Sequence, residues 1–140
     1  MPVSARERSD DADRRLAIWA EALYLVNLLP APVIGFVILA GLFFTRRASA
    51  GPLGTCHLWQ TLAASIWAGV LIVGGAGAIL AIGGAEQPAT WVALLLYVVV
   101  VHSAFILLGV IGLTRAMAGQ PYRYPLIGPQ HCDRGSSGGA

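Results

Sequence analysis

Charged residues are scarce in this sequence. They make up 11% of its 140 residues, whereas a soluble domain carries about 25%. Lysine is absent, so all nine cationic side chains are arginines, and the seven carboxylates leave a net charge of only +2. So small a charge argues against nucleic acid as a partner. Four of the seven acids fall in the first thirteen residues, so little acid–base chemistry is available elsewhere, and we expect that the protein is not an enzyme.

Apolar residues fill most of the chain: 56% are hydrophobic and the mean hydropathy is +0.70. The segment Leu58–Ile82 has no charge in 25 residues, and as a helix it would be about 37 Å long, more than the 30 Å or so of a bilayer's hydrocarbon core. The segment Trp91–Thr114 is similar and contains one ionisable group, His102. Both segments are predicted to be full transmembrane helices.

The first apolar stretch, Leu16–Phe44, is interrupted by Pro30 and Pro32. These prolines remove two backbone donors and turn the preceding residues away from helix. The stretch is therefore either one kinked span or a hairpin of two short helices, Leu16–Leu29 and Val33–Phe44. Each short helix would be only about 18–21 Å long, too short for a full crossing.

The arginine positions favour the hairpin, because short arginine-rich segments normally stay on the cytoplasmic side. With a hairpin, all nine arginines and both termini share that side, and the opposite side has only the Pro30–Pro32 turn and the loop Gly83–Thr90. A single kinked span would separate the first four arginines from the other five. We predict an all-α integral membrane protein with a short or broken N-terminal helical hairpin and two full transmembrane helices.

The two ends of the chain lack apolar periodicity. Such segments bury too little apolar surface to fold by themselves. We therefore expect disordered cytoplasmic tails at residues 1–15 and 129–140, on either side of a membrane helical domain at residues 16–128.

Two motifs resemble those of a known family. The run CHLWQTL at residues 56–62 places a histidine and a glutamine at the mouth of a span, and QPYRYPL at residues 120–126 directly follows the last span. With the order of apolar segments, they resemble a bacterial family of small membrane proteins of unknown function, related in pattern to the Tic-twenty-type component of the chloroplast envelope translocon. The resemblance covers residues 17–127 and implies a short four-helix membrane protein without established catalytic residues. Glu21 stands where that family often has a histidine.

Small residues recur at helical spacing in both predicted spans. They allow two backbones to approach closely inside a membrane. The set consists of Ser65, Gly69, Gly74, Gly77, Ala78, Ala81, Gly109 and Gly112. The neighbouring surface can belong to this chain or to a partner subunit, and the sequence leaves both open.

A few polar side chains fall within the apolar segments: Glu21, Asn27, His57, Gln60 and His102. Such groups are costly in a membrane and are usually paired or line a wet cavity. Glu21 and His57 are expected at similar depth, so we predict a contact between them. The set forms either structural links between helices or a proton or ion site.

No cofactor or metal is predicted. A haem needs two axial ligands at one depth on facing helices, and His57 and His102 are expected at different depths. The pairs Cys56-His57 and His131-Cys132 offer a formal zinc ligand set, but their spacing differs from that of chelating zinc motifs. We expect instead an interfacial histidine and two free thiols, without a disulfide framework.

Aromatic residues cluster near the ends of the apolar runs, as is typical of the headgroup layer. Tyr122, Arg123 and Tyr124 directly follow the last span. We expect them to form a cytoplasmic anchor at the lipid interface, in contact with lipid phosphate. A specific lipid or protein docking site is the sharper form of this prediction.

These features favour a small structural or accessory protein of a bacterial inner membrane, which binds partner subunits or itself through its glycine-rich helix faces. The expected partners are the lipid bilayer and a membrane protein or a second copy of the chain. The alternative is a small oligomeric transporter or channel-like protein. Its polar path would involve Glu21, Asn27, His57 and His102.

Overall fold

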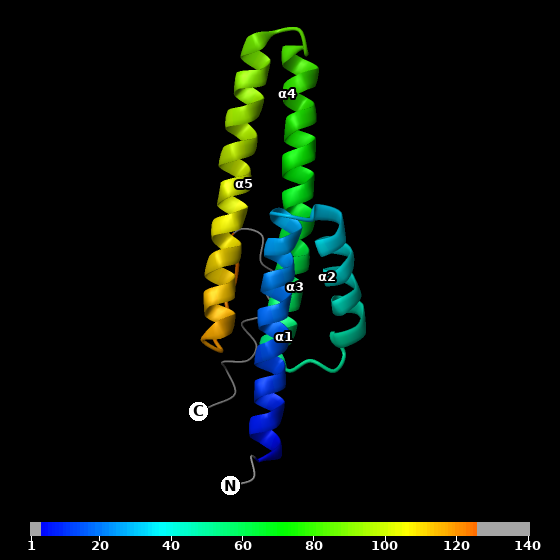
Figure 1. The fold of residues 1–140 in the computed structure, drawn as a ribbon, viewed down its shortest axis with the longest axis vertical. Helices are drawn as coiled ribbons and strands as arrows, with labels where there is room; N and C mark the ends of the chain where they lie inside the picture. Colours follow the sequence, from blue (N-terminus) through cyan, green and yellow to red (C-terminus); the bar gives the residue numbers. More distant parts are fainter. Residues whose placement is uncertain (1–3, 126–140) are drawn as a thin grey trace.

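The computed structural model describes residues 4–125, and these residues form helices without strands (Figure 1). The elements are α1 (Ala5–Leu28), α2 (Pro32–Arg46), α3 (Pro52–Gly69), the π-helical turn η1 (Val70–Gly74), α4 (Gly75–Gly83) and α5 (Pro88–Met117). Because α3, η1 and α4 are continuous, the described chain has four helices. By length and composition, the helices Pro52–Gly83 and Pro88–Met117 can cross a membrane. The predicted fold class is confirmed.

Prolines and glycines set the helix boundaries. The helices α2, α3 and α5 each begin at a proline, which suits the first helical position because its missing N–H has no partner there anyway. Gly84 follows α4 and Gly119 follows α5, with φ angles of 73° and 66°. Glycine adopts this left-handed conformation at little cost and so ends a helix.

Residues 5–15, predicted to be disordered, instead form the first three turns of α1. A capping box starts the helix: Glu7 N–H donates to Ser4 Oγ (3.2 Å), and Ser4 N–H donates to Glu7 Oε2 (2.8 Å). The hydrogen bond with the Ser4 backbone lowers the pKa of Glu7 and keeps it ionised. Two of the helix's unpaired donors are satisfied in this way.

Contacts with other helices hold the same part of α1. The Asp13 carboxylate accepts the N–H groups of Leu53 (3.0 Å) and Gly54 (3.1 Å) in the first turn of α3. The next residue, Arg14, donates to the carbonyl of Met117 at the last turn of α5. Each charge therefore has the sign that the helix dipole favours at that end. These two contacts are the physical reason why the prediction of a disordered N-terminal segment is wrong.

The turn between α1 and α2 lies halfway along the long helices (Figure 1). Pro32 and Val33 line one cavity together with Gly69 and Val73, and in the described chain α4 contacts neither α1 nor α2. Gly83 follows Gly69 by 14 residues, a rise of about 21 Å. The arginine positions predict this turn on the same side of the membrane as the loop after α4, and in the structure the hairpin ends far short of that loop.

The turn leaves few backbone groups without partners. Leu29 N–H donates to Leu25 O (2.9 Å) and Ala31 N–H donates to Val26 O (3.1 Å), while Pro30 and Pro32 have no N–H. Irregular backbone within a membrane is tolerated only where its polar groups are satisfied. The two prolines that interrupt the helix also make its turn suited to an apolar environment.

Above the hairpin, α4 and α5 continue as a pair (Figure 1). The π-helical turn η1 lies at the start of this pair, and such turns release a carbonyl from the regular α-helical pattern. Tyr97 of α5 donates its hydroxyl to Leu71 O (2.7 Å). Gly75 makes room for the Tyr97 ring, because a Cβ at this position would lie 2.0 Å from the hydroxyl oxygen.

The capping of α3 by Asp13 predicts a loss of stability on substitution. Asp13→Ala leaves two N–H groups at the start of α3 without their partner, and we expect it to lower the free energy of unfolding by about 1–2 kcal/mol. The control is Asp10→Ala, an exposed acid in the same helix, which is expected to change little. Unfolding in mixed detergent micelles measures both; equal losses in the two variants would contradict the capping role.

The position of the turn predicts its accessibility. A single cysteine introduced at Ala31 should be protected from a membrane-impermeant thiol reagent on either side of a sealed vesicle, in a background where Cys56 and Cys132 are replaced by serine. A cysteine at Ala85, in the loop after α4, should be labelled from one side. Labelling of the Ala31 position from the same side as Ala85 would show that the hairpin crosses the membrane.

Candidate functional site

Three polar side chains meet in the interior of the half of the molecule that contains the α1–α2 hairpin. His57 Nδ1 lies 2.6 Å from Glu21 Oε1, and Tyr124 donates its hydroxyl to Glu21 Oε2 (2.5 Å). All three residues are fully buried. The predicted contact between Glu21 and His57 is present, and the cluster joins α1, α3 and the segment that follows α5.

The protons of this cluster can be assigned from its partners. His57 Nε2 lies 3.1 Å from the carbonyl oxygen of Gln120, which can only accept, so Nε2 carries a proton. Burial, together with the Glu21 carboxylate, raises the pKa of Tyr124 well above its usual range, so its hydroxyl remains a donor. One further proton lies between His57 and Glu21, and on either atom it leaves every polar atom of the three side chains bonded.

Gln60 holds the same C-terminal segment, one turn of α3 further on. Its Nε2 donates to Tyr122 O (2.7 Å), and its Oε1 accepts the N–H of Tyr124 (2.8 Å). A side-chain amide thus pairs with both a backbone donor and a backbone acceptor, as a neighbouring β-strand would. This pairing fixes the direction in which residues 122–124 pass over α3.

The expected lipid-interface role fails for Tyr124. Its side chain is fully buried and lies with its ring 6.0 Å from that of Tyr24, because the chain turns back after α5 and brings Tyr124 to Glu21. Tyr122 is half-buried and Arg123 is exposed, so a contact with lipid phosphate stays a prediction for these two residues only.

The small residues of the predicted packing set divide into two groups. Gly109 and Gly112 are buried, and a Cβ on Gly109 would lie 2.7 Å from the side chains of Tyr24 and Leu25. On Gly112, it would lie 2.5 Å from Glu21 Oε2 and 2.6 Å from the Tyr124 hydroxyl. These two glycines let α5 approach α1 closely.

The other group faces outward. A Cβ on Gly69, Gly74 or Gly77 would have no atom within 4 Å, and Ala78 and Ala81 are exposed. Ser65 is buried, and its hydroxyl has no hydrogen-bond partner among the described residues. Packing within the chain is therefore present at Gly109 and Gly112, whereas packing of the exposed group against a partner stays a prediction.

Asn27 and His102 lie away from the cluster of Glu21, His57 and Tyr124. They line a cavity of 610 Å³ near the tip of the hairpin, together with Ser65. The structure therefore separates the four residues of the predicted polar path into a buried pair, Glu21 with His57, and a lining pair, Asn27 with His102. It does not bring the two histidines together as haem ligands.

The zinc ligand set falls partly outside the described residues, because they do not include His131 and Cys132. Both ring nitrogens of His57 already have oxygen partners. Cys56 is not a free thiol in the structure, contrary to the expectation of two thiols.

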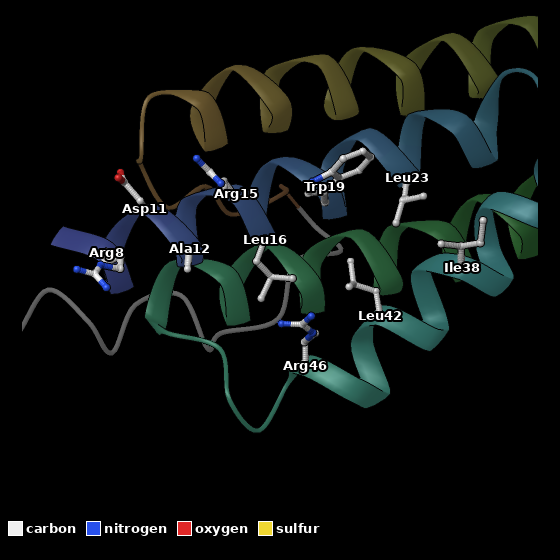
Figure 2. Close-up of a pocket in the computed structure, with 10 residues that line it drawn as sticks. All are labelled: Arg8, Asp11, Ala12, Arg15, Leu16, Trp19, Leu23, Ile38, Leu42 and Arg46. Atoms are coloured by element: carbon white, nitrogen blue, oxygen red, sulfur yellow. The ribbon is translucent and has the colours of Figure 1, made fainter. Parts of the chain in front are cut away.

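A groove opens between α1 and α2 (Figure 2). Its volume is 790 Å³, and its walls are polar at the open ends of the helices and apolar towards the turn. The lining residues are Arg8, Asp11, Ala12, Arg15, Leu16, Trp19, Leu23, Ile38, Leu42 and Arg46. This groove could not be predicted directly from the sequence, because its two walls belong to helices that run in opposite directions.

Fold and site together define a small helical membrane protein whose buried polar groups fasten its elements to one another. The chain belongs to the MamF/MmsF family, described as the magnetosome magnetite crystal formation protein family, which it matches over residues 12–130. No curated protein and no solved structure matches the chain. Membership of a family of small bacterial membrane proteins is thus shown, whereas the two family motifs and the relation to the chloroplast translocon component stay predictions.

The close approach at Gly112 predicts a sharp effect of one methyl group. Gly112→Ala pushes against the Glu21–Tyr124 hydrogen bond, and we expect a loss of roughly 1–3 kcal/mol in the free energy of unfolding. Gly77→Ala adds the same methyl group to an open surface and should change stability little. Unfolding in mixed micelles compares them, and a Gly112→Ala protein as stable as Gly77→Ala would contradict the described packing.

Proposed function

We propose that this chain is a structural accessory protein of magnetosome formation, which packs through the exposed small-residue face of α4 against partner subunits or a second copy of itself. Membership of the magnetosome magnetite crystal formation family supports a role in magnetosome formation. The outward-facing glycines of the α4–α5 pair support the mode of action. The protein would act from within a membrane of the magnetosome-forming cell, as a multi-pass protein with both termini cytoplasmic.

The observation that carries the proposal is the open face of α4. This face consists of Gly74, the last residue of η1, and of Gly77, Ala78 and Ala81 of α4, and all four are exposed. In the described chain α4 packs only against α5 and the adjoining η1. Lipid chains are as apolar as the helix, so hydrophobicity alone does not bring helices together in a membrane. Small residues allow close backbone contact, which is the main source of association there.

The interior of the protein argues for an accessory role. Glu21 and His57 are fully buried and use their polar atoms on each other, on Tyr124 and on the Gln120 carbonyl. Groups that act on a substrate must be reachable by it. The polar cluster therefore serves the shape of the protein, and the surface of α4 remains for recognition.

A double variant, compared with a single variant as its control, tests this function. In Gly74→Leu/Gly77→Leu, two large side chains cover the open face, and we expect cross-linked assemblies in the membrane to fall at least tenfold and magnetite crystals in the cell to change in size or number. Gly41→Leu is the matched control, because Gly41 is also an exposed helical glycine with no atom within 4 Å of its would-be Cβ.

The assembly is measured by cross-linking in isolated membranes, and the crystals by electron microscopy. If the double variant assembles and forms crystals like the unaltered protein, the α4 face is not the contact surface. If Gly41→Leu has the same effect as the double variant, the loss comes from bulk on any helix, and the proposal is equally wrong.

A further inference from the structure

The groove between α1 and α2 combines a cationic end with an apolar end. Arg15 lies towards the start of α1 and Arg46 at the end of α2, and because the two helices are antiparallel these arginines lie at the same end of the groove (Figure 2). Leu23 and Ile38 line the other end, towards the turn. Polarity therefore changes along the groove in a single direction.

The shape of the hairpin produces this groove. Near the turn the helices touch closely, since a Cβ on Gly35 would lie 2.5 Å from the backbone nitrogen of Asn27. Towards Arg15 and Arg46 they leave a volume of 790 Å³ between them. The walls follow regular helical spacing, with Trp19 and Leu23 on one side and Ile38 and Leu42 on the other, so each helix presents one continuous stripe.

The charge at the open end is positive. Arg8, Arg15 and Arg46 line it, against the single carboxylate of Asp11. Within residues 4–125, Arg47 lies over the rings of Phe43 and Phe44, whereas the exposed guanidinium groups of Arg15 and Arg46 make no hydrogen bond or ion pair there. Arginine binds phosphate in a bidentate manner, so this end is suited to a phosphodiester.

The groove also runs in the direction of a lipid molecule. Its apolar end points towards the hairpin turn, which lies at the level of the apolar long helices, and its cationic end lies where α1 and α2 carry their charges. Trp19 stands between the two ends and is 63% exposed, a position typical of the headgroup boundary.

We propose that the groove binds an anionic glycerophospholipid, with its phosphate at Arg15 and Arg46 and an acyl chain along Trp19, Leu23 and Ile38. The site is distinct from the α4 face and does not depend on the assembly proposed for it. Neutral lipids should fit the apolar part of the groove equally well, so selection between lipids comes from the two arginines.

Native mass spectrometry of the full chain in nonionic detergent tests the site, with added phosphatidylglycerol or phosphatidylcholine as the probes. The unaltered protein should retain phosphatidylglycerol over phosphatidylcholine by about 30-fold, as expected for two basic residues near a lipid headgroup. Arg15→Gln/Arg46→Gln should bring the two lipids to within about threefold of each other. The control Arg6→Gln/Arg47→Gln removes the same charge outside the groove and should keep the preference.

A second variant tests the apolar part. Ile38→Trp fills the groove and should lower retention of both lipids at least tenfold while the protein elutes as a folded species. The proposal fails if the two double variants lose phosphatidylglycerol equally, since the charge would then act without a site, or if Ile38→Trp has no effect. It also fails if millimolar inorganic phosphate displaces the lipid completely, because the ligand would then be free phosphate.

Discussion

A buried carboxylate must find partners to replace the water that it has lost, and Glu21 is the residue on which this requirement falls. Moving such a group out of water costs several kcal/mol, which good geometry and further hydrogen bonds must offset. The partners, His57 and Tyr124, come from α3 and from the segment after α5, and Gly112 supplies the space. Three elements of the chain therefore take their relative positions from one side chain.

The long helices could be predicted from the sequence because a membrane imposes a simple rule, namely an uncharged run of sufficient length. The hairpin could be predicted too: Pro30 and Pro32 left a kinked span or a hairpin, and the arginine positions favoured the hairpin. The helical structure of residues 5–15 could not be predicted. Its polar composition is that of a solvated segment, and the groups that fix it lie far along the chain, with Leu53 40 residues beyond Asp13.

The candidate site was predictable only in part, for a similar reason. Glu21 and His57 were expected at similar depth in the membrane, and this was enough to predict their contact. The sequence YRYPL has the composition of an interfacial anchor, and only the return of the chain over α3 shows that Tyr124 belongs to the interior. Likewise, Gly77 and Gly112 both lie in uncharged apolar segments of the sequence. The packing of α1 beside α5, and not beside α4, decides which of them is buried.

The short reach of the α1–α2 hairpin makes the molecule unequal in width along its length. Four helices lie side by side in one half, and only α4 and α5 continue into the other (Figure 1). Within a bilayer such a wedge displaces more lipid area from one leaflet than from the other. It is accommodated with less strain where the membrane is curved and the broad half lies on the convex side.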